Sequence, residues 1–188
     1  FIAQQTLLPQ ASHYELFGAQ ISFDDGVLAI ASSSSEFTGN ISVYERFTPL
    51  RSGRTGWVNY GYTYNLSSAA GGSNGFFDGF ATQIEVVSSP RRILASAPGA
   101  DYMQINAGCV YSFAPSVDQP GQWNLDAMMT SSSAVPGDAA GPFAVGHDTV
   151  LVGCPGSDDA VGTPRRILDF AFGETVSWVW QGGGNMSE

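Results

Sequence analysis

Lysine is absent from this chain of 188 residues, and its seven basic side chains are all arginine. The glycine loop that cradles nucleotide phosphates ends in lysine, so a site of that type is excluded. Seventeen acidic residues stand against the seven arginines and give a formal net charge of −10. This charge repels a phosphate backbone, so nucleic acid is not expected as a partner, and anionic membrane surfaces are disfavoured for the same reason.

Long apolar runs and cysteines are also scarce. No stretch approaches the roughly 18 apolar residues that cross a bilayer as a helix, so membrane insertion is not predicted. The two cysteines, Cys109 and Cys154, are too few for a disulfide framework. We predict small buried thiols, with a disulfide between repeats as the alternative. Because the chain opens at Phe1, we expect a processed product or a piece of a longer chain.

The residues that are abundant predict strands joined by turns. Charged residues make up 13% of the chain, about half the usual share, while glycine and serine are frequent. Apolar residues alternate, or form short runs between clusters of Gly, Pro, Asp and Ser. Both patterns are typical of strands rather than helices. The sequence therefore predicts an all-β protein.

Three stretches of the sequence resemble one another. Each opens with a phenylalanine, at Phe17, Phe80 and Phe143. Alignment on a leucine of the following apolar run gives spacings of 66 and 57 residues. This leucine is Leu28, Leu94 or Leu151 in the successive copies. Such spacings lie within or slightly beyond the range of propellers and solenoids.

Each copy predicts four strands in the same order. The first strands are 19–23, 81–87 and 143–145, and the second strands are 27–31, 93–97 and 150–154. The third strands are 40–47, 108–113 and 175–180, and the fourth begin near Trp57 and Trp123 and end near Leu66 and Met129. The second strands are nearly continuous apolar runs, which are typical of strands buried on both faces.

The two ends of the chain are out of phase with this repeat. Residues 2–8 look like a fourth strand without the other three, and the last copy lacks a fourth strand. In a β-propeller such an offset lets the first strand complete the last blade and removes exposed sheet edges. We predict blades of four antiparallel strands, about three in number, in a ring that is partial or is completed by further blades or a partner. The predicted division is 1–10 as an outer strand of a preceding or closing blade, 11–66 and 67–129 as blades, and 130–188 as a blade without its outer strand.

The order of motifs resembles a known repeat. Phe17-Gly18, Leu-Ala-Ser-Ala-Pro at 94–98 and Gly-Cys-Val-Tyr-Ser-Phe at 108–113 resemble the FG-GAP repeat of integrin alpha propellers and of many secreted or surface proteins. The resemblance implies a non-enzymatic structural or protein-interaction module in an extracellular or lumenal assembly. One alternative is a carbohydrate-binding propeller that holds a glycan on Trp57 or Trp123, although we predict the tryptophans mainly as packing between blades. The other alternative is an accessory domain of a larger hydrolase.

The loops offer few groups for chemistry. Many FG-GAP repeats hold calcium in a loop of alternating carboxylates, because a hard cation needs several converging oxygens. The loops here supply only Asp101 and the adjacent Asp158 and Asp159, so we predict no cofactor or metal, with calcium as the alternative. No Gly-x-Ser-x-Gly elbow accompanies His13 or His147, so no enzyme is predicted.

Two further motifs recur. The sequence Pro-Arg-Arg-Ile-Leu occurs at 90–94 and at 164–168, out of register with the repeat. Its arginines are predicted to pair with acidic neighbours or to dock on an acidic partner. The candidate partner-binding residues are Arg165, Arg166, Asp158, Asp159 and Asp101. Candidate glycosylation sites of an exported chain are the Asn-x-Ser sequons at Asn40, Asn65 and Asn185.

Overall fold

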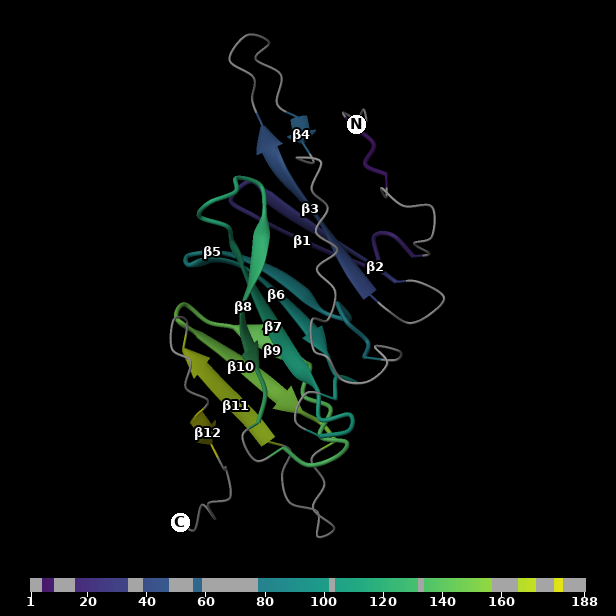
Figure 1. Cartoon of the computed structure of the whole chain (residues 1–188), viewed down its shortest axis with the longest axis vertical. Coiled ribbons are helices and arrows are strands. Elements are labelled where there is room, and N and C mark those ends of the chain that lie inside the picture. Colours follow the sequence, from purple (N-terminus) through teal and green to yellow (C-terminus); the bar gives the residue numbers. More distant parts are fainter. Residues whose placement is uncertain are drawn as a thin grey trace, which may run out of the picture.

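The computed structural model confirms that the chain is all-β. It describes residues 5–8, 16–33, 39–47, 56–58, 78–101, 104–131, 134–156, 166–171 and 178–180. These residues form three four-stranded antiparallel sheets (Figure 1). They contain no helix, and thus none with the length and hydropathy to cross a membrane.

Each sheet is built from four consecutive strands in chain order. The first sheet contains β1 (Gln20–Asp24), β2 (Val27–Ser33), β3 (Gly39–Phe47) and β4 (Gly56–Val58). The second contains β5 (Ile84–Ser88), β6 (Arg91–Ala97), β7 (Cys109–Pro115) and β8 (Trp123–Met129). The third contains β9 (Phe143–Val145), β10 (Thr149–Cys154), β11 (Arg166–Ala171) and β12 (Trp178–Trp180).

A two-residue turn joins β1 to β2. Asp24 pairs with Val27 at the end of the ladder, and Asp25 and Gly26 between them both have positive φ, 39° and 76°. This is the turn chemistry that an Asp-Gly dipeptide favours in a hairpin, since both central residues must adopt the left-handed region. The turn thus lies between the strands predicted at 19–23 and 27–31.

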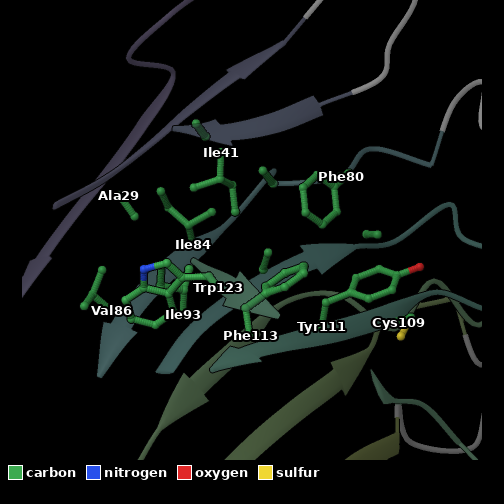
Figure 2. Packing of buried hydrophobic residues seen from close by; sticks show 14 of the residues in the cluster. Ala29, Ile41, Phe80, Ile84, Val86, Ile93, Cys109, Tyr111, Phe113 and Trp123 are labelled. Carbon is green, nitrogen blue, oxygen red and sulfur yellow. The ribbon is translucent and has the colours of Figure 1, made fainter. Parts of the chain in front are cut away.

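The sheets follow one another along the longest axis of the molecule (Figure 1). Between the first and second sheets, Ala29 and Ile41 point toward Ile84, Val86 and Ile93 (Figure 2). A second buried cluster lies between the second and third sheets. It consists of Leu94, Val110, Met129, Ala140, Phe143, Val150, Val152 and Cys154. The sheets are thus held together face to face by two separate apolar cores.

The middle sheet is buried on both faces. Along β6, Ile93 and Ala95 belong to the core shared with the first sheet, whereas Leu94 belongs to the core shared with the third. All three have no exposed surface. Because successive residues of a strand point to opposite faces, a continuous apolar run is what such a strand requires. The prediction from the sequence is confirmed for β6.

Polar side chains join the first strands of neighbouring sheets. The Gln83 side chain donates to the carbonyl of Phe143 (2.7 Å) and accepts from the Phe143 N–H (3.1 Å). One sheet earlier, the Ser22 hydroxyl accepts from the N–H of Val86 at 2.9 Å. Both contacts satisfy backbone groups at the free edge of a first strand.

The sequence placed the third strand of the last sheet wrongly. Residues 175–180 were expected there, but β11 (Arg166–Ala171) pairs with β10, and Trp178–Trp180 forms the fourth strand. Strands that follow one another in the chain tend to pair, and β11 is the first described strand after β10. The last sheet therefore has a fourth strand, which was not predicted for the last copy.

The N-terminal segment also differs from its prediction. Residues 5–8, the described part of the expected strand 2–8, form no strand. The Gln5 side chain instead hydrogen-bonds the backbone of Trp57, and the Leu8 carbonyl accepts from the Tyr44 hydroxyl at 3.2 Å. These residues thus lie against the first sheet. The predicted boundaries of the repeats remain a prediction.

The hydrogen bonds give a more accurate alignment of the first two copies. Gly18 N–H donates to Ala31, and Ala81 N–H donates to Ser96. With these pairs superposed, Leu28 corresponds to Ile93, and not to Leu94 as the sequence alignment had it. Since a slip of one residue moves a side chain to the other face of a sheet, this correction decides which residues are equivalent in packing.

Candidate interaction surface

One face of the first sheet is turned away from the second sheet. The register places on it Ile21, Phe23, Leu28, Ile30, Tyr44 and Trp57, which we call the open face. The rings of Phe23 and Trp57 meet edge to face with centroids 5.5 Å apart. Strands β1 to β4 thus all contribute apolar side chains to one surface.

The open face exposes residue positions that are buried in the second sheet. Ile21 and Phe23 have 63% and 56% of their surface exposed. The corrected alignment makes them equivalent to Ile84 and Val86, which are 7% and 5% exposed because they pack on the first sheet. Large apolar side chains gathered on a surface mark interaction sites. The open face therefore has the composition of an interface between sheets.

Residues 5–8 cover only part of the open face. Tyr44 is 4% exposed, and its hydroxyl donates to the Leu8 carbonyl. Gln5 accepts from the Trp57 N–H at 2.9 Å and donates to the Trp57 carbonyl at 3.0 Å, much as a paired strand would. The Tyr44 side of the face is therefore covered, whereas Ile21 and Phe23 are left to solvent.

The third sheet has an exposed side of its own. In β10, Val150 and Val152 are buried against the second sheet, but Leu151 between them is 43% exposed. Leu151 pairs with Ala144 of β9, which is also exposed, and we call these two residues the far face. Leu94, the counterpart of Leu151 in the second sheet, has no exposed surface. The first and third sheets lie at opposite ends of the molecule (Figure 1).

The candidate partner-binding residues are only partly described. Arg165, Asp158 and Asp159 lie outside the described residues, and Arg166 is the first residue of β11. Asp101 is exposed, and its Oδ1 accepts from the backbone N–H of Asn106 at 2.7 Å. Asp101 thus closes its own loop between β6 and β7.

Of the three sequons, only Asn40 lies among the described residues; Asn65 and Asn185 lie outside them. Asn40 is 4% exposed in β3, and its Oδ1 accepts from the Ser32 hydroxyl at 3.0 Å. A glycan needs an exposed amide nitrogen. The burial of Asn40 therefore argues against this site.

The first Pro-Arg-Arg motif pairs with acidic neighbours, as predicted. Arg91 lies 3.2 Å from Glu45 of the first sheet and also lies over the ring of Trp123. Arg92 donates through Nε to Asp126 at 2.9 Å. Both pairs are partly exposed, so each contributes about 1 kcal/mol or less. The second copy of the motif reaches into β11, so the same residues occur in a second strand of one sheet and a third strand of another.

The tryptophans divide between core and surface. Trp123 is 2% exposed in the core between the first and second sheets, which confirms packing for this residue and removes it as a platform for a sugar. Trp57 is half-buried on the open face, and His147 lies exposed in the turn before β10. Trp178 and Trp180 belong to β12.

Both thiols are buried, and neither is part of a disulfide. Cys109 and Cys154 have no exposed surface and form no disulfide, so the buried-thiol prediction is confirmed and the disulfide alternative is wrong. Burial raises the pKa of Cys109 to about 12, although a hydrogen bond with the backbone of Met129 acts in the opposite direction. The thiolate, which is the reactive form, is thus disfavoured.

We expect neither thiol of the native chain to react with Ellman's reagent at pH 8. Burial excludes the reagent, and a pKa of about 12 leaves Cys109 protonated. In urea at the same pH, both cysteines should react within minutes, because unfolding restores an ordinary thiol pKa and access. Absorbance of the released thiolate measures both states. Rapid labelling of Cys109 without denaturant would contradict its burial.

No group of three or more His, Cys, Asp and Glu side chains suited to a metal ion occurs within the described ranges. No family model, curated protein or solved structure matches the chain. The functional argument therefore depends on the open face and the far face. Sequence reasoning missed both, although Ile21 and Phe23 at alternate positions of a terminal sheet were a signal that its outer side is apolar.

Proposed function

We propose that this chain is a non-enzymatic structural module that joins a larger assembly through the faces of its terminal sheets. The observation that carries the proposal is the exposure of Ile21 and Phe23 at positions that are buried one sheet later. Stacked repeat proteins need terminal repeats with a polar outer face to stay soluble alone. The first sheet is apolar there, so it fits the interior of a stack better than its end.

As part of this proposal, the three sheets belong to a propeller-like arrangement. A propeller blade is a sheet of four antiparallel strands in chain order, as each of these sheets is. The sheets also pack face to face, as neighbouring blades do. The order of the FG-GAP-like motifs favours the same arrangement and an extracellular or lumenal location. In this proposal further blades or a protein partner cover the open face.

Photo-crosslinking from position 23 tests the proposal. We expect the full chain carrying p-benzoylphenylalanine in place of Phe23 to form one discrete crosslinked product in cells that express it natively. The photoreactive ring would lie within a covered interface, because Phe23 is one of the two strongly exposed side chains of the open face. Denaturing gels and mass spectrometry identify the product.

The control carries the same residue in place of Val117. Val117 is 97% exposed in the loop between β7 and β8 and belongs to neither the open face nor the far face. It should give no discrete product. Absence of a product from position 23, or equal products from both positions, would overturn the proposed function.

A further inference from the structure

We propose that the open face of the first sheet binds the far face of the third sheet in a second copy of this chain. Two chains then join head to tail, so that each open face is covered by the far face of the other. This inference rests on the proposed function and names the partner. The partner surface is the outer face of the third sheet, where the register places Leu151 between Ala144 and Asp169. It has the packing polarity found twice within the chain.

The contact between the first and second sheets and the contact between the second and third sheets, which we call joints, pair the same two kinds of sheet face. At the first joint, Ile84 and Val86 of the later sheet pack on the side of the earlier sheet that carries Ala29 and Ile41 (Figure 2). At the second joint, Phe143 and Val145 of the later sheet take the place of Ile84 and Val86. They pack on the side of the earlier sheet that carries Leu94 and Val110. Each joint therefore combines two different kinds of face.

Among the described sheets, one face of each kind is left without a neighbouring sheet. The open face is equivalent to the one that carries Ile84 and Val86, and the far face is equivalent to the one that carries Leu94. Exposure follows this equivalence, since Phe23 and Leu151 are exposed where Val86 and Leu94 are buried. The two unmatched faces are thus of opposite kinds and repeat the combination used at both internal joints.

The number of sheets favours two copies. Two copies of the three sheets formed by the described residues give six, which lies within the range of about four to eight blades in closed propellers, whereas three copies exceed it. A head-to-tail contact either closes into a ring or continues as a filament. Closure at two chains covers both open faces and both far faces at once and leaves none for a third chain.

Charge sets the salt dependence of this association. Each chain carries a formal net charge of −10, so two copies repel each other at long range. Salt screens this repulsion, with a Debye length of about 10 Å at 0.1 M. Dimerisation through apolar faces should therefore strengthen as the salt concentration rises.

The test is native mass spectrometry and light scattering on the purified full chain over a concentration series. We expect a discrete dimer, and each of Phe23→Glu and Leu151→Glu alone should give a monomer, because each places a charge in both interfaces. An equimolar mixture of the two variants should recover a dimer with one intact interface, formed by the open face of the L151E chain and the far face of the F23E chain. Val117→Glu is the matched control and should remain dimeric, and circular dichroism checks that every variant is folded.

Three results would overturn the inference. They are a wild-type chain that stays monomeric at every concentration, a Leu151→Glu chain that still dimerises, and a mixture that stays monomeric. The second result would mean that two open faces meet each other. If the purified chain is monomeric while position 23 still crosslinks to one different protein in cells, the inference fails and the proposed function stands. If neither experiment gives a product, both fail.

Discussion

Replacing Gly108 by alanine is expected to destabilise the chain by about 3 kcal/mol or more, one of the largest effects for a single methyl group here. Gly108 has a φ of +77°, a conformation that L side chains rarely adopt. A Cβ at this position would overlap the backbone of Ala140, with which Gly108 forms a parallel bridge. Backbone cannot move aside as a flexible side chain can. The segment that leads into β7 must therefore separate from the segment that contains Ala140.

Gly137→Ala is the matched control for this substitution. Gly137 has a similar φ of +85°, but a Cβ there meets nothing within 4 Å. It carries only the backbone penalty, about 1 kcal/mol. Urea unfolding followed by circular dichroism gives both free energies. Equal losses for the two variants would mean that the close approach of Gly108 to Ala140 contributes nothing.

The same close approach occurs at the earlier joint. A Cβ on Gly39, the first residue of β3, would overlap the carbonyl of Phe80. In both places the glycine lies where the third strand of one sheet begins, and its neighbour lies just before the first strand of the next sheet. Glycine therefore sets how closely successive sheets approach, and the apolar cores depend on this spacing.

Much of the local structure could be predicted from the sequence, because its causes are local. Alternation and short apolar runs determine where strands form, and the Asp25-Gly26 turn follows from its dipeptide. Burial of β6 on both faces follows from its nearly continuous apolar run. These features need only the neighbouring residues, and the structure confirms them.

The register between copies could not be predicted in the same way. Leu28 and Leu94 are identical residues, yet the hydrogen bonds make Ile93 the counterpart of Leu28. Similarity of residues does not record which face a side chain occupies, and a difference of one position reverses that face. For the same reason, the exposed positions of β1 can be recognised as interface positions only when the β1–β2 ladder is compared with the β5–β6 ladder.

The prediction of the third strand of the last sheet was wrong for a different reason. The segment Val-Ser-Trp-Val-Trp has the alternation of a strand, and it is one over Trp178–Trp180. Its place in the sheet depends on whether another strand pairs with β10 first, and Arg166–Ala171 does so. Order within a sheet is a competition between segments, which periodicity alone does not decide.

Replacing Trp123 by alanine is expected to cost 3–5 kcal/mol, by the typical loss for a buried tryptophan. Trp123 is 2% exposed, packs in the core between the first and second sheets, and supports Arg91, which also pairs with Glu45 across that joint. The substitution leaves a cavity at the joint and removes the ring beneath the guanidinium. Urea unfolding should show a lower midpoint, with loss of both the aromatic and the backbone circular dichroism signals in one transition.

Trp123→Phe separates packing from a role in binding. Phenylalanine keeps an aromatic ring beneath Arg91 and removes an indole N–H that finds no hydrogen-bond partner among the described residues. The loss should therefore be roughly 1.5 kcal/mol or less, well below that of alanine. A sugar-stacking tryptophan would behave differently, since its removal would abolish glycan binding and leave the unfolding midpoint unchanged. A stable W123A chain would contradict the burial of this residue and with it the core that joins the first two sheets.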